Sequence, residues 1–186
     1  MRPAVVRDGW RRSSRTMKRY ASSSNADSLP LAGVKVLDMT RVLAGVNRNK
    51  KSIGLPFKDP AGVAILKKLV STCDVFVENY IPDSLKKYGQ DYDTLQATNL
   101  RLVYASITGY RQTGPYRKRA GYDVMVEAET GLMHITGTRD GPPVKIGVAV
   151  TNLTTTLYTS NAIMAALLSR AKSGRGQYID IALSDA

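Results

Sequence analysis

Four short apolar segments, separated by stretches that carry helix signals, constrain the fold of this chain most strongly. Strands that alternate with helices are joined by long crossovers, so they lie parallel in one sheet whose two faces the helices cover. The sequence therefore predicts an α/β fold, a Rossmann-like parallel sheet with helices on both faces. The expected strands are Val34–Asp38, Asp74–Val77, Leu102–Ile107 and Gln177–Leu183.

The segments between these strands carry helix signals of different strength. Val63, Leu66 and Val70 lie at helical spacing and predict an amphipathic helix. A cap residue followed by proline is typical of a helix start, and glycine is typical of a helix end. The expected helices are one that begins at Asp59-Pro60, a short segment from Pro82, Asp123–Met133, and Leu153–Lys172 ended by Gly174.

Positive charge is concentrated at the N-terminal end. The formal net charge is +12, and residues 1–25 hold seven of the 27 basic residues but only one of the 15 acids, Asp8. An Arg-rich, Ser-rich and acid-poor leader is typical of a mitochondrial transit peptide. We therefore expect residues 1–25 to be this peptide and the protein to lie in the mitochondrial matrix. Charge alone leaves open a basic arm that binds nucleic acid, although we expect no nucleic-acid partner.

Composition disfavours several kinds of site. Cys73 is the only cysteine, so an internal disulfide is impossible, and we expect a buried small hydrophobe. His134 is the only histidine, so no metal site is expected. The stretch Ile146–Leu168 carries no charge, but its threonines and asparagines favour a buried core helix over a membrane span.

Three loops are expected at the functional edge of the sheet. In parallel α/β sheets, ligands collect outside the carboxyl ends of the strands, where loops and helix N-termini offer backbone N–H groups. The loops that fall there are Thr40–Gly45, Glu78–Tyr80 and Thr108–Tyr122.

Five sequence blocks, in the same order, resemble the signature blocks of family III CoA-transferases of the CaiB/BaiF type. The resemblance covers nearly everything after residue 30. Within the family, the chain is most similar to the mitochondrial branch that moves CoA from succinyl-CoA to 3-hydroxy-3-methylglutarate or glutarate. The blocks are Leu31–Gly45, Asn47–Ile53, Asp74–Asn79, Ser106–Pro115 and Arg119–Asp123.

The resemblance implies a covalent mechanism. An enzyme aspartate attacks the thioester of the acyl-CoA and forms an aspartyl-acyl anhydride, and the acyl group then passes to the dicarboxylic acid. N–H donors stabilise the oxyanions that form along the way. In the family, the nucleophilic aspartate lies just after a Gly-Val-Ala block, which is Gly147–Ala149 in this chain.

Asn152 occupies the position of that nucleophile. An amide carries no negative charge and its nitrogen lone pair is delocalised, so it cannot replace the carboxylate. We therefore expect little or no acyl transfer by this chain. The plainer interpretation of Asn152 is a helix N-cap, a role that asparagine fills as well as aspartate.

The resemblance also implies which residues contact CoA, which would enter as succinyl-CoA; no metal is implied. Arginine suits paired contacts with phosphate, and lysine acts as a point charge. Lys50 and Lys51 have an alternative interpretation as part of a solvated turn. The expected CoA contacts are Arg41, Val42, Leu43, Lys50, Lys51, Asn79 and Tyr80.

Parts of the family's sequence have no counterpart here. Val46 runs directly into Asn47, where the family has a helix and a strand, and family members continue beyond Ala186. We therefore expect residues 26–186 to be a partial large domain, internally deleted and C-terminally truncated, and incomplete relative to the family's interlocked-ring homodimer. The alternative to an enzyme is a non-catalytic isoform that acts as a partner or dimer-interface subunit of the full-length enzyme.

Overall fold

The computed structural model of the chain describes residues 30–40 and 50–186. The chain divides into two units, Met1–Gly33 and Val34–Ala186. Of the first unit only residues 30–33 are described, and they form an exposed turn in which Gly33 has a φ of 80°. All the described helices and strands belong to the second unit.

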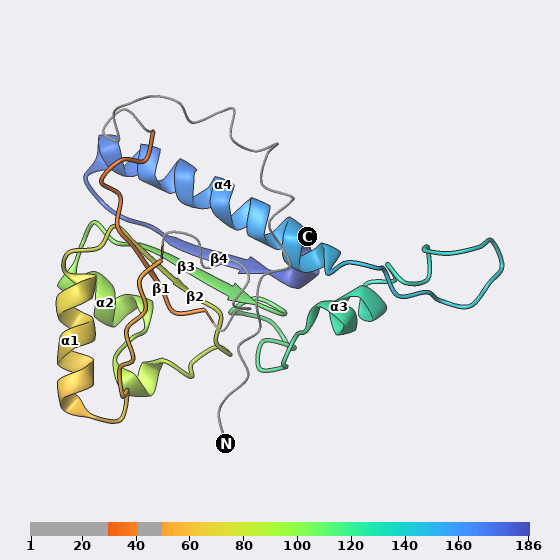
Figure 1. Cartoon of the computed structure of the whole chain (residues 1–186), viewed down its shortest axis with the longest axis horizontal. Coiled ribbons are helices and arrows are strands. Elements are labelled where there is room, and N and C mark those ends of the chain that lie inside the picture. The colour runs from red at the N-terminus through yellow and green to blue at the C-terminus, as the bar shows by residue number, and fades with distance from the viewer. Residues whose placement is uncertain (1–29, 41–49) are drawn as a thin grey trace, which may run out of the picture. The chain divides into compact units, whose positions relative to one another are not determined.

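A four-stranded parallel sheet forms the centre of the second unit (Figure 1). The strands lie in the order β1-β2-β3-β4, and they are β1 (Val36–Asp38), β2 (Val75–Glu78), β3 (Val103–Thr108) and β4 (Tyr178–Ala182). Because every neighbouring pair is parallel, all four strands end at the same edge of the sheet. We name this edge the carboxyl edge and the opposite one the amino edge.

Two helices, α1 (Pro60–Val70) and α2 (Tyr92–Thr98), cover one face of the sheet (Figure 1). Asp59 caps α1 by accepting the Ala61 N–H at 2.8 Å, which confirms the predicted helix start. Apolar side chains of both helices pack on this face of β2 and β3. The buried cluster consists of Leu66, Val70, Cys73, Phe76, Leu95, Leu102 and Tyr104.

The helix α4 (Val150–Ser173) covers the opposite face and ends at Gly174, whose φ is 73°. Its buried side includes Thr151, Thr155 and Thr159. The hydroxyls of Thr155 and Thr159 donate to the carbonyl oxygens four residues earlier, at 2.6 and 2.7 Å. Because these hydroxyls are satisfied within the helix, threonines can lie against an apolar sheet face.

The other side of α4 is apolar and exposed. Leu153, Leu157, Met164 and Leu168 are between 41% and 71% exposed. Among the described residues, α4 is therefore covered on one side, unlike the buried core helix expected from its uncharged sequence. Among the described helices, none is long and apolar enough to span a membrane.

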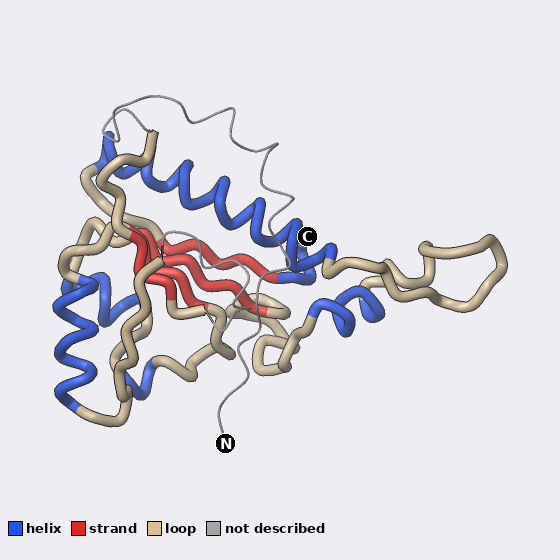
Figure 2. Tube along the Cα trace, in the orientation of Figure 1, coloured by secondary structure: helices blue, strands red, loops and turns tan. Residues whose placement is uncertain are grey.

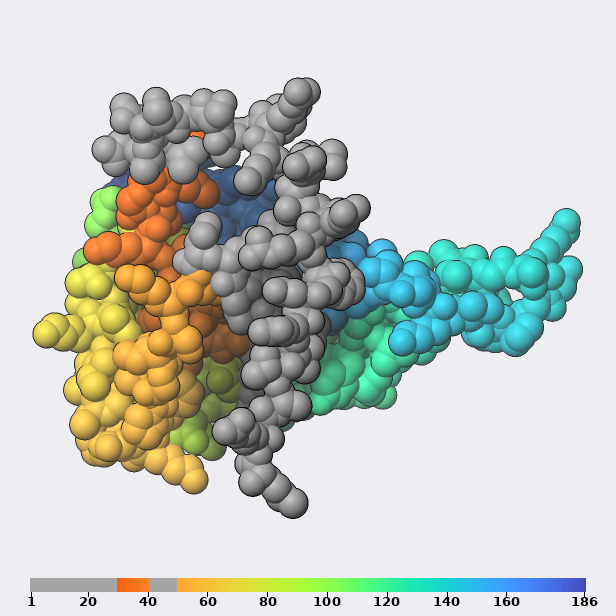
Figure 3. Space-filling model, in the orientation of Figure 1, coloured from red at the N-terminus to blue at the C-terminus, as the bar shows by residue number. Residues whose placement is uncertain are grey.

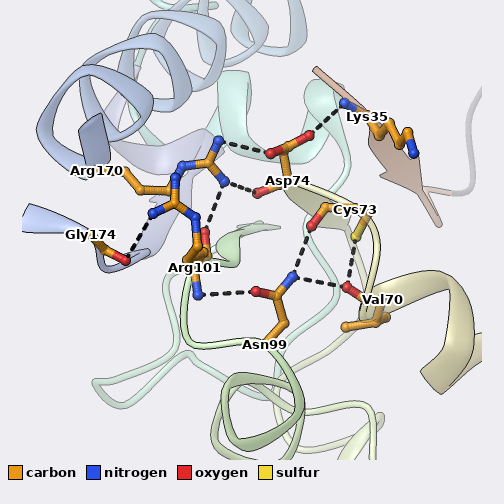
Figure 4. Close-up of polar contacts among 8 residues, drawn as sticks. All are labelled: Lys35, Val70, Cys73, Asp74, Asn99, Arg101, Arg170 and Gly174. Carbon is orange, nitrogen blue, oxygen red and sulfur yellow. Dashed lines mark hydrogen bonds and ion pairs between the residues drawn. The ribbon is translucent and has the colours of Figure 1, made fainter. Parts of the chain in front are cut away.

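A polar network joins the amino edge of the sheet to the last turns of α4 (Figure 4). Arg170, only 8% exposed, donates to the Asp74 carboxylate and to the Arg101 carbonyl, both at 2.9 Å. The other carboxylate oxygen of Asp74 accepts the Lys35 N–H at 2.8 Å. Asn99 donates to two carbonyl oxygens between α1 and β2, at 3.0 and 2.9 Å. One buried arginine and one carboxylate thus connect segments that are far apart in the sequence.

Two glycines in close contact shape the loop between β3 and α3 (Asp123–Glu129). A Cβ on Gly109 would lie 2.5 Å from the Cα of Gly121, and a Cβ on Gly121 would lie 2.4 Å from the Cα of Gly109. Only glycine at both positions permits this approach. Beyond α3, residues 131–149 form a long loop without helix or strand (Figure 2).

The predicted fold class is confirmed, and the strands lie close to their predicted ranges. α3 ends at Glu129, earlier than predicted, because Gly131 with a φ of 82° turns the chain. The segment expected from Pro82 is a single 3-10 turn, η3 (Lys86–Tyr88), and α2 is not among the predicted helices. A last 3-10 turn, η4 (Leu183–Asp185), follows β4. Cys73 is buried as expected, and burial raises the pKa of its thiol to about 11.

Candidate functional site

The carboxyl edge begins at Asp38, the last residue of β1. Its carboxylate accepts the backbone N–H and the hydroxyl of Thr40, at 2.9 and 2.6 Å, and it pairs with Lys50. Burial acts to raise the pKa of Asp38, but the hydrogen bonds from Lys50 and Thr40 outweigh it and leave the pKa lowered. Lys50, an expected CoA contact, is therefore engaged with a carboxylate in this structure.

Glu78, the last residue of β2, is only 4% exposed. One of its oxygens accepts the Ser106 hydroxyl, and the other accepts the Tyr80 N–H at 2.7 Å. Burial raises the pKa of Glu78 and the Asp180 carboxylate adds to the rise, while the two hydrogen bonds oppose it. A buried acid with a raised pKa at a strand end is typical of functional sites.

Gln112 and Asp180 extend this arrangement across β3 and β4. The Gln112 side chain donates to the Ser106 hydroxyl at 2.6 Å, and its backbone N–H donates to Asp180 Oδ2 at 3.2 Å. Within the described residues, Asp180 Oδ1 and the hydroxyl of Thr108 are buried without a hydrogen-bond partner. We name Glu78, Ser106, Gln112 and Asp180 the polar row; its hydrogen bonds are only partly satisfied.

Asn152 lies in the first turn of α4, where it is exposed. The N-cap of this helix is Ala149, which makes no side-chain cap, so the prediction that Asn152 is an N-cap is wrong. Asp123, at the start of α3, acts as the cap instead. Its Oδ1 accepts the Asn152 N–H at 2.8 Å and the Thr151 hydroxyl. A carboxylate from a neighbouring helix therefore holds the turn that carries position 152.

A basic pocket of about 550 Å³ lies between α1, the segment before it and η3. Figure 3 draws α1 and the segment before it in yellow and orange. Its wall combines Lys58, Lys67 and Lys87 with the rings of Phe57 and Tyr88, whose centroids are 6.1 Å apart. Lys87 Nζ lies 4.9 Å from the centroid of the Tyr88 ring. Among residues 30–40 and 50–186, no acidic residue lines this pocket. Lysines beside aromatic rings suit a ligand that joins phosphate groups to a flat ring.

A second pocket, of about 320 Å³, adjoins the polar row and is acidic. Its wall carries Glu78, Asp83, Asp91 and Asp93 against a single lysine. Tyr178 also lines it, and burial raises the pKa of this phenol to about 12, so the phenol stays protonated at neutral pH. The two pockets differ in the sign of their charge, and an anionic ligand is favoured only by the basic one.

The expected CoA contacts are only partly within the described residues. Asn79 and Tyr80 follow β2 directly and are half-buried at the carboxyl edge. Lys51 is exposed beside Lys50. The expected contacts that lie outside the described residues are Arg41, Val42 and Leu43.

The sequence predicted neither the basic pocket nor the polar row as a unit, although Glu78 and Gln112 lie in two of the loops expected at the functional edge. The lysines of the pocket come from three separate segments, so their spacing gives no signal. The row left a signal: Glu78, Ser106 and Asp180 are polar residues at or near the ends of apolar strands, where register places them side by side. In the described part of the chain, no three His, Cys, Asp or Glu side chains are grouped to hold a metal ion.

A family model, curated relatives and solved structures all match this chain, and all three are CoA-transferases of one family or share its fold. Residues 44–186 match the model of CoA-transferase family III. Succinyl-CoA:glutarate CoA-transferase of Mus musculus is 44% identical over 201 residues, which cover 84% of this chain and 46% of the relative. Succinate–glutarate CoA-transferase of Agrobacterium fabrum is 50% identical over 139 residues, which cover 75% and 35%.

The alignment with the mouse enzyme is longer than the part of this chain that it covers. It extends over 201 residues, whereas 84% of this chain of 186 residues is about 156, so about 45 positions have no counterpart here. The alignment with the Agrobacterium enzyme has no such excess, since its 139 residues correspond to 75% of the chain. These figures give a number of positions and not their place, so the internal gap between Val46 and Asn47 stays a prediction.

A solved structure carries the same fold. A CAIB/BAIF family protein from Brucella suis is 47% identical and aligns with a TM-score of 0.73, over 75% of this chain and 37% of that protein. The chain spans less than half the length of these relatives. The family match over residues 44–186, the identities of 44% to 50% and the shared α/β fold show that the chain belongs to CoA-transferase family III.

Proposed function

We propose that this chain is part of a mitochondrial CoA-transferase that moves CoA from succinyl-CoA to a dicarboxylic acid, such as glutarate or 3-hydroxy-3-methylglutarate. We further propose that the chain binds the acyl-CoA but transfers its acyl group slowly or not at all. The relatives named for succinyl-CoA and glutarate support the substrate class. The observation that supports CoA binding is the basic pocket, whose described wall has three lysines and no acid.

The chemistry of CoA matches the basic pocket. CoA carries phosphate groups beside an adenine ring. Lys58, Lys67 and Lys87 offer point charges to phosphate oxygens, and Phe57 and Tyr88 offer rings on which adenine can stack. We therefore assign the phosphorylated adenosine end of CoA to this pocket.

The strand ends are proposed to hold the rest of the ligand. Asn79 and Tyr80 lie at the carboxyl edge, where ligands of parallel α/β sheets collect. Lys51 remains a proposed contact beside them. Lys50 is a weaker choice because its ammonium group is paired with Asp38.

Asn152 accounts for the expected loss of acyl transfer. The residue is exposed in the first turn of α4, where the helix dipole favours a negative charge. A carboxylate at this place could attack a thioester and form the anhydride, whereas an amide cannot. Asp123 does not replace it, because its Oδ1 is engaged with Thr151 and the Asn152 N–H.

Titration calorimetry of the chain with CoA tests whether CoA binds in the basic pocket. We expect Lys87→Glu and Lys58→Glu each to weaken binding at least tenfold, a change of about 1.4 kcal/mol. Dephospho-CoA, which lacks the 3′-phosphate, should bind more weakly than CoA and should depend less on these lysines. Lys172→Glu, near the end of α4, is the matched control and should change affinity less than twofold. Equal affinity for all variants would exclude the basic pocket as the site.

Incubation with succinyl-CoA and glutarate tests the catalytic half. We expect no glutaryl-CoA by chromatography, and no acyl adduct on the protein by intact mass. Asn152→Asp alone should not restore full turnover, because the chain spans less than half of its relatives and the remaining substrate contacts lie in the rest of the enzyme. Robust turnover by the unmodified chain would overturn the role given to Asn152.

A second candidate function is a non-catalytic subunit that pairs with the full-length enzyme, which we propose to be a homodimer. The exposed apolar side of α4 favours it, since Leu153, Leu157, Met164 and Leu168 lie on a helix without charge until Arg170. Coexpression with an affinity-tagged complete relative should recover both chains in one complex. Leu157→Glu with Leu168→Glu should abolish that recovery, and separate elution of the unmodified chains would exclude the subunit role.

The mitochondrial location is a separate proposal that depends on residues 1–25. Fusion of these residues to a fluorescent reporter should direct it to the matrix. Replacement of their seven basic residues by glutamine should leave the reporter in the cytosol. A reporter that stays cytosolic with the natural sequence contradicts this location.

A further inference from the structure

We infer that Asp123 and Glu127, one helical turn apart on α3, share a proton and together clamp the first turn of α4, which fixes the position of residue 152. The functional meaning of this clamp rests on the proposed function, because that proposal gives position 152 its role. The contacts themselves do not depend on it.

The clamp on α4 is formed by Asp123. Its Oδ1 accepts the Asn152 N–H at 2.8 Å and the Thr151 hydroxyl. The helix has no cap of its own at Ala149, so this carboxylate takes the place of a local cap. Position 152 is therefore held by a residue from a different helix, across the long loop 131–149.

Glu127 lies one helical turn after Asp123 on α3. Its side chain is completely buried, and within the described residues neither of its oxygens receives a well-formed hydrogen bond from a donor. A buried carboxylate without donors is strongly disfavoured in its charged form. The neutral acid, in contrast, has an O–H to donate, and the Asp123 carboxylate, four residues earlier on the same helix, is the acceptor within its reach. Since Oδ1 of Asp123 already accepts two donors, Oδ2 is the acceptor left for this proton.

The groups that face Glu127 come from three segments. Asp123 lies on its own helix, Lys145 lies in the loop before α4, and the Val150 N–H lies at the start of α4. Burial raises the pKa of Glu127 and the hydrogen bond and charge of Asp123 raise it further, while the Val150 N–H and Lys145 act to lower it. The net rise agrees with a proton held between the two carboxyl groups.

The pair makes the first turn of α4 sensitive to pH. Because the folded-state pKa of Glu127 lies above its ordinary value of 4.5, the shared proton stabilises the fold fully below that value. The stabilisation is lost as the pH rises through the raised pKa. Above it, two adjacent negative charges oppose the clamp, and the hydrogen bond to Asn152 should weaken.

Amide hydrogen exchange of Asn152, measured by NMR and expressed as a protection factor, tests the clamp. We expect protection to fall as the pH rises, in step with the carboxyl carbon shift of Glu127. Asp123→Ala should lower the protection of Asn152 about tenfold, since a hydrogen bond to a charged acceptor is lost. Asp59→Ala removes the local cap of α1 and serves as the matched control, which should leave Asn152 unchanged.

Glu127→Gln distinguishes proton sharing from simple packing. Glutamine keeps a donor towards Asp123 but does not titrate, so Asn152 should stay protected at every pH and the pH step should vanish. Glu127→Leu keeps the apolar volume without a donor, and Asn152 should lose protection at low pH as well. This comparison stays informative even where Asp123→Ala fails to fold.

Two results would overturn the inference. One is a Glu127 carboxyl group that titrates at its ordinary value; the other is an Asn152 amide whose protection is the same in Glu127→Leu as in the unmodified chain. Failure of CoA to bind would remove the proposed function but leave these measurements unchanged. The two proposals can therefore fail separately.

Discussion

The two edges of the sheet are built in opposite ways. At the amino edge, Asp74 accepts from Arg170 and from the Lys35 N–H, and Arg170 also donates to the Arg101 carbonyl. At the carboxyl edge, the polar row leaves Asp180 Oδ1 buried without a partner in the described part of the chain, and burial raises the pKa of Glu78. The polar groups of the amino edge thus have hydrogen-bond partners, whereas those of the carboxyl edge reduce the stability of the fold.

This difference indicates which edge is structural and which is functional. A buried polar atom without a partner costs stability, so it persists mainly where another requirement keeps it. The carboxyl edge is also where the expected CoA contacts Asn79 and Tyr80 lie. The amino edge, in contrast, only joins β1, β2 and β3 to the end of α4.

The largest effect is expected from breaking the amino edge. Arg170→Met removes the cation and leaves the Asp74 carboxylate, whose side chain is 29% exposed, with the Lys35 N–H but without a charged partner. We expect the free energy of unfolding to fall by about 3 kcal/mol, measured by urea denaturation. Arg175→Met, an exposed position, should change it by less than about 0.5 kcal/mol. Equal stability of the two variants would mean that the network does not hold this edge.

A smaller effect is expected at the glycine contact that shapes the carboxyl edge. Gly109→Ala places a Cβ 2.5 Å from the Cα of Gly121 and forces the loop open. The cost should be about 2 kcal/mol in thermal unfolding, as for other overpacked sites. Gly54→Ala is the control, because nothing lies within 4 Å of its added Cβ. If both substitutions behave alike, the close approach has no energetic weight.

The smallest effect is expected in the pH dependence of stability, at Glu78 on the carboxyl edge. The folded-state pKa of Glu78 is raised above 4.5, so its contribution to stability is fully present below that value and declines as the pH rises through the raised pKa. Glu78→Gln should remove this decline from the pH profile of the unfolding free energy, with a change of about 1 kcal/mol or less at neutral pH. Glu129→Gln, a more exposed position, should keep it. A pH profile that Glu78→Gln leaves unaltered contradicts the assignment.

The sheet could be predicted from the sequence because its signal is local. Val75, Phe76 and Val103 lie in short apolar runs, and the helix signals at Asp59-Pro60 and Gly174 are local as well. The buried side of α4 was harder to predict. Its threonines are polar residues, but the hydroxyls of Thr155 and Thr159 donate to carbonyl oxygens of the same helix, so these side chains can be buried.

The site was only partly predictable, because its contacts join distant segments. No sequence pattern shows that Asp123 caps the turn of Asn152, since the long loop 131–149 separates them. In the same way, Lys58 and Lys87 meet only when η3 packs against the start of α1. Residue type alone suggested that Asn152 was a cap, and tertiary structure gave that role to a carboxylate.

The way in which α4 is attached has a mechanical consequence. Described side chains of other segments hold it by polar bonds near its two ends, through Asp123 at the first turn and Asp74 at Arg170, about 27 Å apart along the helix. Between these ends, the hydroxyls of Thr155 and Thr159 face the sheet. They donate to carbonyl oxygens of the helix itself, so they make no hydrogen bonds to the strands. The helix is therefore attached by side-chain hydrogen bonds near both of its ends. We therefore expect a displacement of Arg170 along the helix axis to move the turn at position 152 with it, because the backbone hydrogen bonds of an α-helix keep its rise per residue nearly constant.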